Sequence, residues 1–175
     1  METCLDREGF DYHCRELPYP NKFIVKKPYG GGGLALIWKA NVQVEVINFT
    51  DHHILARVVE EDGFAWMLTC FYGWPEVSRK HKLWALLNRL RSFVDYPWCC
   101  IRDFNAILSF AKKKSWFPPP FRQMDEFRGA LDWCSLVDLG FVGYPFTWNN
   151  KWLGLDNTKE RLDRVVVDTG WKNKF

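Results

Sequence analysis

The sequence contains no apolar run that approaches the roughly 18 residues of a membrane-spanning helix. Its first eight residues include no apolar segment of the kind found in secretory signals. Cysteine occurs six times, but no two cysteines are spaced as Cys-x-x-Cys, which excludes a zinc ribbon or a thioredoxin-like redox motif. We therefore expect an intracellular protein without a membrane partner, in which the thiols are reduced and mostly buried.

A strong net charge is also missing. The chain has 24 Lys and Arg against 21 Asp and Glu, a formal net charge of +3. This small excess permits a nucleic-acid partner but does not argue for one. Four consecutive glycines end at Gly33, yet neither Gly-Lys-Ser/Thr nor a helical pattern follows them. We expect a connection between two strands there, not a phosphate-binding loop.

Aromatic residues are abundant, with ten Trp and fourteen Phe in 175 residues. This content predicts an ordered chain with a sizeable core. Apolar or alternating segments predict strands at residues 23–25, 34–38, 42–47, 54–59, 64–72, 98–101, 137–141, 146–148 and 162–167. Apolar residues at helical spacing predict helices at 75–94 and 123–134, with a last helix beginning near 168. Helices that connect strands indicate a mixed α/β class.

Two groups of polar residues beside these elements have ordinary structural explanations. The first helix carries a basic face that includes Arg79, and such faces are usually solvated, although some contact phosphates. His52 and His53 stand beside Asp51 just before a strand. Adjacent strand residues point to opposite faces, so we expect the two rings not to share one metal ion.

The most informative stretch is a short apolar strand, Trp98 to Ile101, followed at once by Asp103 and Asn105. Polar groups at the end of a buried strand are costly unless they are paired or bind a metal or substrate. Residues two apart on an extended chain point the same way. From these residues alone, the more ordinary outcome is an Asx turn, in which both side chains bind local backbone.

Several segments acquire a further meaning when they are taken together. They are Gly31 to Trp38, Phe71-Tyr72-Gly73-Trp74-Pro75-Glu76, Arg102-Asp103-Phe104-Asn105-Ala106-Ile107-Leu108, Arg122-Gln123-Met124, Phe146-Thr147-Trp148 and Glu160-Arg161-Leu162-Asp163-Arg164. In this order they resemble the endonuclease/exonuclease/phosphatase superfamily, specifically the endonuclease domain of plant LINE-type (non-LTR) retrotransposons. The resemblance covers the chain from Glu2 to Phe175.

The resemblance implies a four-layer α/β (α+β) sandwich, with two mixed β-sheets face to face and helices on the outer faces. It implies one domain at residues 1–175 that lacks the family's first strand and its C-terminal Ser-Asp-His strand. The implied activity is cleavage of DNA phosphodiester bonds with Mg²⁺, or with Mn²⁺ in its place. The implied setting is the nucleus, with a reverse transcriptase region as covalent neighbour and no obligate protein partner.

The resemblance also implies roles for individual residues. Glu2 matches the metal-binding Glu, and Tyr72 matches the tyrosine that contacts the scissile phosphate. Asp103 and Asn105 match the pair that orients the attacking water and supports the phosphate. Thr147 and Asp163 match positions at the DNA-facing end of the sheets, and we expect Arg79 to add a phosphate contact. These residue types suit the chemistry, because Mg²⁺ prefers carboxylate oxygens and a carboxylate can position water.

Two departures from the family bear on activity. Arg102 stands where the family has Gly, and Ala106 stands where it has Glu. If that glycine serves an unusual backbone angle, an arginine obstructs the site. We therefore carry two main hypotheses, an active Mg²⁺-dependent endonuclease and a catalytically inactive retroelement remnant that at most binds nucleic acid. A third keeps the fold for another phosphoester, such as a small molecule or a lipid headgroup.

Overall fold

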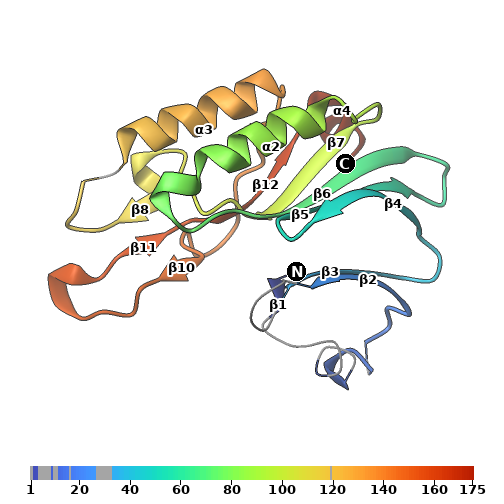
Figure 1. Cartoon of the computed structure of the whole chain (residues 1–175), viewed down its shortest axis with the longest axis horizontal. Coiled ribbons are helices and arrows are strands. Elements are labelled where there is room, and N and C mark those ends of the chain that lie inside the picture. The colour runs from blue at the N-terminus through green and yellow to red at the C-terminus, as the bar shows by residue number, and fades with distance from the viewer. Residues whose placement is uncertain (1, 4–8, 10–11, 16, 27–32, 119) are drawn as a thin grey trace.

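The computed structural model describes residues 2–3, 9, 12–15, 17–26, 33–118 and 120–175. Its largest element is a six-stranded sheet in the order β4-β5-β6-β7-β12-β9 (Figure 1). These strands are β4 (Gln43–Thr50), β5 (His53–Val59), β6 (Ala65–Tyr72), β7 (Trp98–Asp103), β9 (Val137–Asp138) and β12 (Asp163–Val167). The β6–β7 pair is parallel and the other pairs are antiparallel, so the sheet is mixed.

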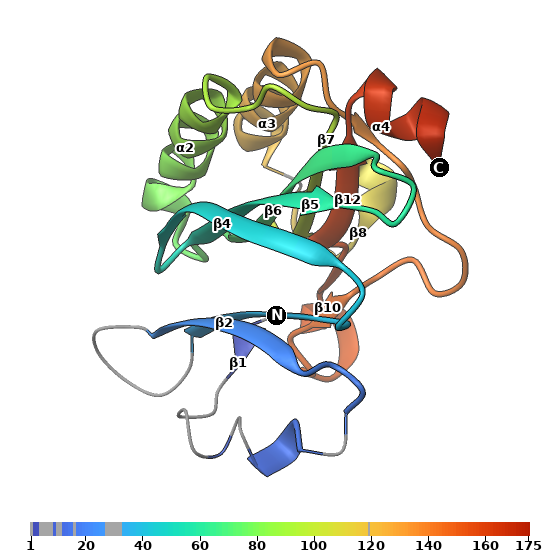
Figure 2. The same ribbon diagram turned by 90° about the vertical axis from the view of Figure 1, so that its right-hand side faces the viewer.

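Helices cover one face of this sheet. The parallel β6–β7 pair requires a crossover, which is supplied by the short 3-10 helix η1 (Val77–Arg79) and by α2 (His81–Arg91). α3 (Phe121–Trp133) lies beside α2 on the same face (Figure 2). The apolar stripes of both helices meet the sheet in one core, where the rings of Trp84 and Phe127 stack 4.4 Å apart. α4 (Thr169–Lys174) ends the chain.

The opposite face of the large sheet packs on a second sheet with the order β1-β3-β2. Its strands are β1 (Glu2–Thr3), β2 (Asn21–Lys26) and β3 (Gly33–Trp38), and Figure 2 shows them below the large sheet. Val25 and Leu34 from the small sheet pack with Ile54 and Cys70 from the large one. Two facing sheets with helices outside confirm the fold class expected from the sequence.

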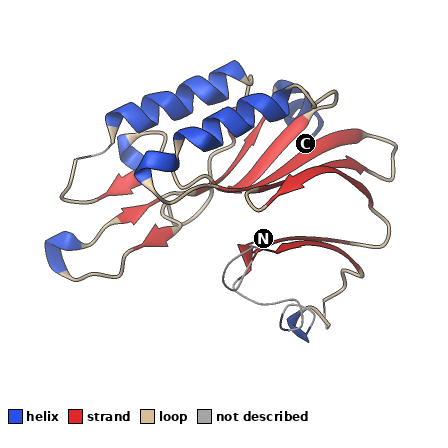
Figure 3. Cartoon of the chain, in the orientation of Figure 1, coloured by secondary structure: helices blue, strands red, loops and turns tan. Residues whose placement is uncertain are grey.

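A third, smaller sheet extends away from the body of the fold, at the lower left of Figure 3. It has the order β10-β11-β8, from β10 (Trp148–Asn149), β11 (Lys159–Glu160) and β8 (Lys113–Lys114). Two 3-10 helices flank its strands, η2 (Phe110–Lys112) and η3 (Gly154–Asp156).

The helix boundaries differ from those expected. The first helix begins at His81 and not at Pro75, because residues 77–79 form the tighter 3-10 turn. The second begins at Phe121, directly after Pro120, so Asp125 and Glu126 fall outside its first turn. They form ion pairs with arginines one turn away instead.

Other expectations concern the glycine run, the thiols and the membrane. Residues 27–32 lie outside the described residues, but Lys26 pairs with Gly33, so the flanking strands are antiparallel neighbours. Cys70, Cys99, Cys100 and Cys134 are buried, and burial raises the pKa of each thiol, for Cys99 to about 12. Within the described ranges, no helix has the length and apolar character needed to cross a membrane.

Candidate active site

Three of the residues singled out from the sequence stand in one row across the large sheet. Tyr72 is the register partner of Asp103 in the parallel β6–β7 pair, and Asp163 is its partner in the antiparallel β7–β12 pair. Register partners on neighbouring strands point to the same face, with Cβ atoms roughly 5 Å apart. Tyr72 packs against the cluster between the two sheets, so this face looks toward the small sheet.

The row places two carboxylates opposite each other, an arrangement that destabilises a sheet unless a cation compensates it. Lys80, at the start of α2, is one compensating charge. Burial lowers the pKa of Lys80, while the nearby carboxylates of Glu160 and Asp103 favour its charged form. The sequence marked Lys80 only as part of a basic face. Arg79, the residue expected to contact DNA, has a half-exposed side chain that lies 3.7 Å from a carboxylate oxygen of Glu76.

Asp103 and Asn105 form a tight turn at the end of β7. The Asn105 N–H donates to Asp103 Oδ1 at 2.7 Å, which is an Asx turn. Asn105 has a φ of 49°, so the extended geometry assumed from the sequence does not hold there. Its Nδ2 instead donates to the Gly73 carbonyl at 2.8 Å. The turn thereby ties the end of β7 to the chain that leaves β6.

Gly73 is required at this junction. A Cβ atom added to it would lie 2.7 Å from the backbone oxygen of Phe104, closer than side chains tolerate. The Gly73 N–H also donates to the Asp103 carbonyl at 2.7 Å. A larger residue at this position would therefore push the Asp103 turn away from Tyr72.

Arg102 occupies a backbone conformation that suits glycine. Its φ is 100°, in a region that L-residues with a side chain rarely adopt. Strain of this kind costs on the order of 1–3 kcal/mol and persists only where the surrounding structure enforces it. The family resembled by the sequence has glycine here, and the backbone angle explains why. Arg102 thus adopts the fold's local geometry at an energetic cost.

Thr147 holds Asp163 in place from the segment before β10. Its Oγ1 accepts hydrogen bonds from the backbone N–H groups of Leu162 and Asp163, each at 3.0 Å. Thr147 remains exposed, so it lies at the surface beside the row. The sequence predicted a place for Thr147 at the DNA-facing end of the sheets, but it did not reveal this positioning contact.

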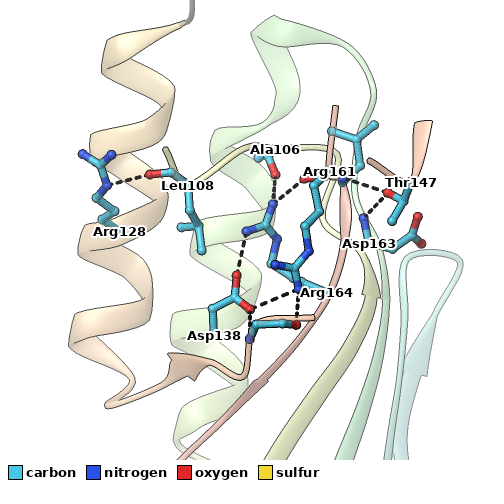
Figure 4. A network of polar contacts seen from close by, with 10 residues as sticks. Ala106, Leu108, Arg128, Asp138, Thr147, Arg161, Asp163 and Arg164 are labelled. Atoms are coloured by element: carbon cyan, nitrogen blue, oxygen red, sulfur yellow. Dashed lines mark hydrogen bonds and ion pairs between the residues drawn. The ribbon is translucent and has the colours of Figure 1, made fainter. Parts of the chain in front are cut away.

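A buried network of charges supports the row from the helix side (Figure 4). The Arg164 guanidinium donates to the carbonyls of Ala106 and Arg161, both at 2.6 Å, and lies 3.3 Å from Asp138 Oδ2. Arg161 lies 3.3 Å from Asp138 Oδ1 and donates to the Gly140 carbonyl. The two arginine side chains are only 0% and 4% exposed. Burial lowers the pKa of Arg164 to about 10, although Asp138 opposes that shift.

This network joins the two segments that carry the carboxylates. Ala106 belongs to the loop after the Asp103 turn, and Arg161 lies in the short connection between β11 and β12. The bonds from one guanidinium therefore connect the segments beside Asp103 and Asp163, which are already register partners in the β7–β12 pair. Sequence reasoning did not place these arginines inside the protein, because arginine is rarely buried unless it is paired. The available signal was the apolar neighbours of these arginines, since Arg161 precedes Leu162 and Arg164 precedes Val165 to Val167.

The comparisons with known proteins bear on the fold. The sequence matches no protein-family model and no curated protein. Among solved structures, it is similar to the endonuclease domain of TRAS1, a telomere-specific non-LTR retrotransposon, with a TM-score of 0.69 and 14% identity over 87% of this chain and 68% of that one. It is also similar to an endonuclease/exonuclease/phosphatase family protein from Bacteroides thetaiotaomicron (TM-score 0.61, 13% identity, 96% and 67% of the two chains). The chain has the endonuclease/exonuclease/phosphatase fold.

A further structure of this fold, TDP2 from D. rerio in complex with single-strand DNA product, matches with a TM-score of 0.60 and 16% identity over 96% of this chain and 69% of that one. The chain thus spans about two thirds of the length of each of these three proteins. Identities this low establish the fold alone.

Candidate ligands for a metal ion occur among the described residues of the site. Asp103 and Asp163 supply the carboxylate oxygens that Mg²⁺ prefers. Glu2 stands in β1 as the register partner of Leu34, whose side chain packs between the sheets. The side chain of Glu2 lies outside the described residues. Among the described side chains, no group of three or more His, Cys, Asp or Glu is placed to hold an ion. Carboxylates of this kind are donor types that fit a hard cation.

The two histidines occupy different surroundings near the row. The ring of His52 stacks on Trp74 with centroids 3.6 Å apart, and its Nδ1 lies 2.8 Å from the Tyr72 carbonyl. His53 is buried, with Nδ1 2.9 Å from Thr50 Oγ1 and Nε2 3.0 Å from the side-chain oxygen of Asn48. Burial lowers the pKa of His53 to about 4, so this ring is neutral at pH 7. His52 therefore braces the strand end that carries Tyr72, and His53 belongs to the core.

Proposed function

We propose that this protein is a metal-dependent phosphodiesterase that cleaves DNA. The observation that carries the proposal is the row of Tyr72, Asp103 and Asp163. It places a hydroxyl and two carboxylates on one face of the large sheet, where β6 and β7 end and β12 begins. The similar structures support it, because one is a retrotransposon endonuclease domain and another contains a DNA product. A plant LINE-type origin, suggested by the sequence motifs, is the more specific form of the proposal.

In this function, Asp103 positions the attacking water and accepts its proton. The Tyr72 hydroxyl and the second amide hydrogen of Asn105 donate to the phosphoryl oxygens as negative charge develops. Lys80 supplies positive charge beside Asp103, where a bound phosphate would lie. The Asx turn and the Arg164 network keep these groups at a fixed spacing, which reduces the reorganisation needed during the reaction.

Glu2 and Asp163 are the residues that would hold a Mg²⁺ or Mn²⁺ ion. When bound, such an ion acts as a Lewis acid on a phosphoryl oxygen and stabilises the leaving oxygen. We further propose, from the resemblance of the sequence motifs, that the reaction takes place in the nucleus and that a reverse transcriptase region is the covalent neighbour.

A second candidate function is nucleic-acid binding without cleavage. The observation that favours it is Arg102, which stands next to Asp103 in a strained conformation. The Arg102 guanidinium at this point can bind the phosphate, while its bulk obstructs the approach of the attacking water. In this second candidate function, the chain keeps an inherited nuclease site that binds nucleic acid but no longer cleaves it.

A plasmid-nicking assay combined with a binding assay separates the two functions. The wild-type chain and Glu2→Gln are incubated with supercoiled plasmid in Mg²⁺ and, in parallel, in EDTA. Fluorescence anisotropy with a labelled duplex reports binding. Nicking that needs Mg²⁺ and is lost in Glu2→Gln supports the nuclease. Salt-sensitive binding without nicking in any metal supports the second function, and the absence of both refutes the proposal.

A further inference from the structure

An aromatic pocket is formed by residues of η2, of β8, of the loop that follows β8 and of the start of α3. It is a cavity of about 350 Å³ lined by Phe110, Lys113, Ser115, Phe117 and Phe121. The phenylalanines are 52%, 55% and 59% exposed, so their rings form an open apolar surface. Phe110 and Phe121 meet edge to face with centroids 4.9 Å apart, which fixes the orientation of both rings.

The polar groups of this pocket are held in place. Ser115 Oγ lies 2.8 Å from Thr158 Oγ1 and accepts a hydrogen bond from the Phe117 N–H at 3.2 Å. Lys113 Nζ lies 3.0 Å from Glu160 Oε1, and both of these side chains are largely buried. The pocket therefore combines aromatic faces with a fixed hydroxyl and a fixed ammonium group.

The surroundings of the pocket favour an anionic ligand. Lys112 and Lys114 flank Lys113 in the sequence. Arg122 follows Phe121 with a side chain that is 91% exposed and is paired with Glu126 at 2.8 Å. The first turn of α3, which borders the pocket, contains no acidic residue. The volume lies at the lower end of the range for small-molecule pockets, which suits one planar ring system and not a peptide segment.

The charged residue at the rim of the pocket lies near Lys80, which also lies near the candidate site. Lys80 has the charges of Asp103 and of the Lys113–Glu160 pair close to it. A nucleic-acid strand with a phosphate at Asp103 would therefore pass Lys80 and reach Lys113 at the rim of the pocket.

We propose that this pocket binds one unpaired nucleobase of a DNA strand by stacking on the Phe117 and Phe121 rings. The inference rests on the proposed function for its ligand class, but it concerns a separate subsite. Aromatic faces stack on any base, because every base has a π face. The lysines beside the pocket contact the adjoining phosphates, and the Ser115 hydroxyl faces the edge of the base.

The test uses the full chain and a single-stranded oligonucleotide that carries 2-aminopurine at one position. All measurements are made in EDTA, so that they report binding and not cleavage. The fluorescence of 2-aminopurine is quenched when the base stacks on an aromatic ring. Wild type, Phe117→Ala, Phe121→Ala and Phe117→Tyr are titrated and compared with Trp133→Ala. Trp133 is a suitable control because it is 74% exposed at the far end of α3.

The proposal predicts quenching with wild type and an increase in Kd of about fivefold to 100-fold for each alanine variant, the range measured for lost base stacking. Phe117→Tyr and Trp133→Ala should bind like wild type. An oligonucleotide with an abasic site in place of 2-aminopurine should bind more weakly than the intact one. Equal affinity of the abasic strand, or equal effects of Phe117→Ala and Trp133→Ala, would overturn the inference. Displacement of the oligonucleotide by a proline-rich peptide would also overturn it. Because no metal is present, these outcomes are independent of whether the chain nicks DNA.

Discussion

Replacing Arg102 with glycine is expected to stabilise the protein, although it removes a large side chain. Arg102 has a φ of 100°, and holding a residue with a Cβ in such a region costs roughly 1–3 kcal/mol. Glycine adopts this angle without the steric cost but loses more backbone entropy on folding, by about 0.5–1 kcal/mol. In the described part of the chain, no hydrogen bond or ion pair holds the Arg102 side chain, so little else is lost. The net expectation is a gain of about 1 kcal/mol, or about 2–4 °C in Tm for a chain of this size.

Urea denaturation of wild type, Arg102→Gly and Arg102→Ala measures this effect. Arg102→Ala is the matched control, because alanine also loses the guanidinium but keeps the Cβ that causes the strain. We expect Arg102→Gly to have the highest urea midpoint, with an unchanged m-value in all three proteins. A midpoint for Arg102→Gly at or below that of Arg102→Ala would show that the backbone at this position is not strained, and the account of the glycine departure would fail.

Three further predictions address the core, the network and the candidate site. The folded pKa of His53, about 4, lies below the unfolded value of 6.5, so its neutral form contributes stability above pH 6.5 that is lost as the pH falls toward 4. Thermal melts between pH 7 and 4 should show this loss, and His53→Asn should flatten it. Asp138→Ala leaves two buried guanidinium groups without their carboxylate and should cost about 3 kcal/mol in urea unfolding. Asp125→Ala, which breaks an exposed pair, should cost less than about 0.5 kcal/mol, and equal costs would contradict the buried network. Lys80→Met should weaken duplex binding roughly tenfold in an anisotropy titration, because a charge-assisted phosphate contact contributes about 1.5–3 kcal/mol. Arg79→Met should change it little, and the reverse ranking would exclude Lys80 from the site.

The fold was largely predictable because the local patterns agreed with one another. The alternation along β4 and the apolar stripes of α2 and α3 each correspond to one side packed against the core. Element ends were less predictable. The 3-10 turn at Val77–Arg79 uses residues that would also suit an α-helix, so the local sequence does not distinguish the two.

The candidate site was predictable in its residues but not in its geometry. Sequence motifs pointed to Asp103 and Asp163, and the strand register makes them neighbours. The contacts that hold these two residues in place join segments that are far apart in the sequence, so no local sequence pattern reveals them. Arg164 is buried only because Ala106 and Asp138 come to it from distant segments. Lys80 differs from the other basic residues of its helix only through the carboxylates that the fold places beside it.

The most direct test of the proposed phosphodiesterase centre is the initial rate of strand cleavage on a 5′-labelled DNA duplex in Mg²⁺. Wild type is compared with Asp103→Asn and with Asp132→Asn, whose side chain is exposed on α3. The loss of a general base typically lowers a rate by a factor of 10²–10⁴. The account predicts a fall of at least about 100-fold for Asp103→Asn and no change for Asp132→Asn. Cleavage by Asp103→Asn at the wild-type rate, or no cleavage by wild type above the EDTA background, would contradict it.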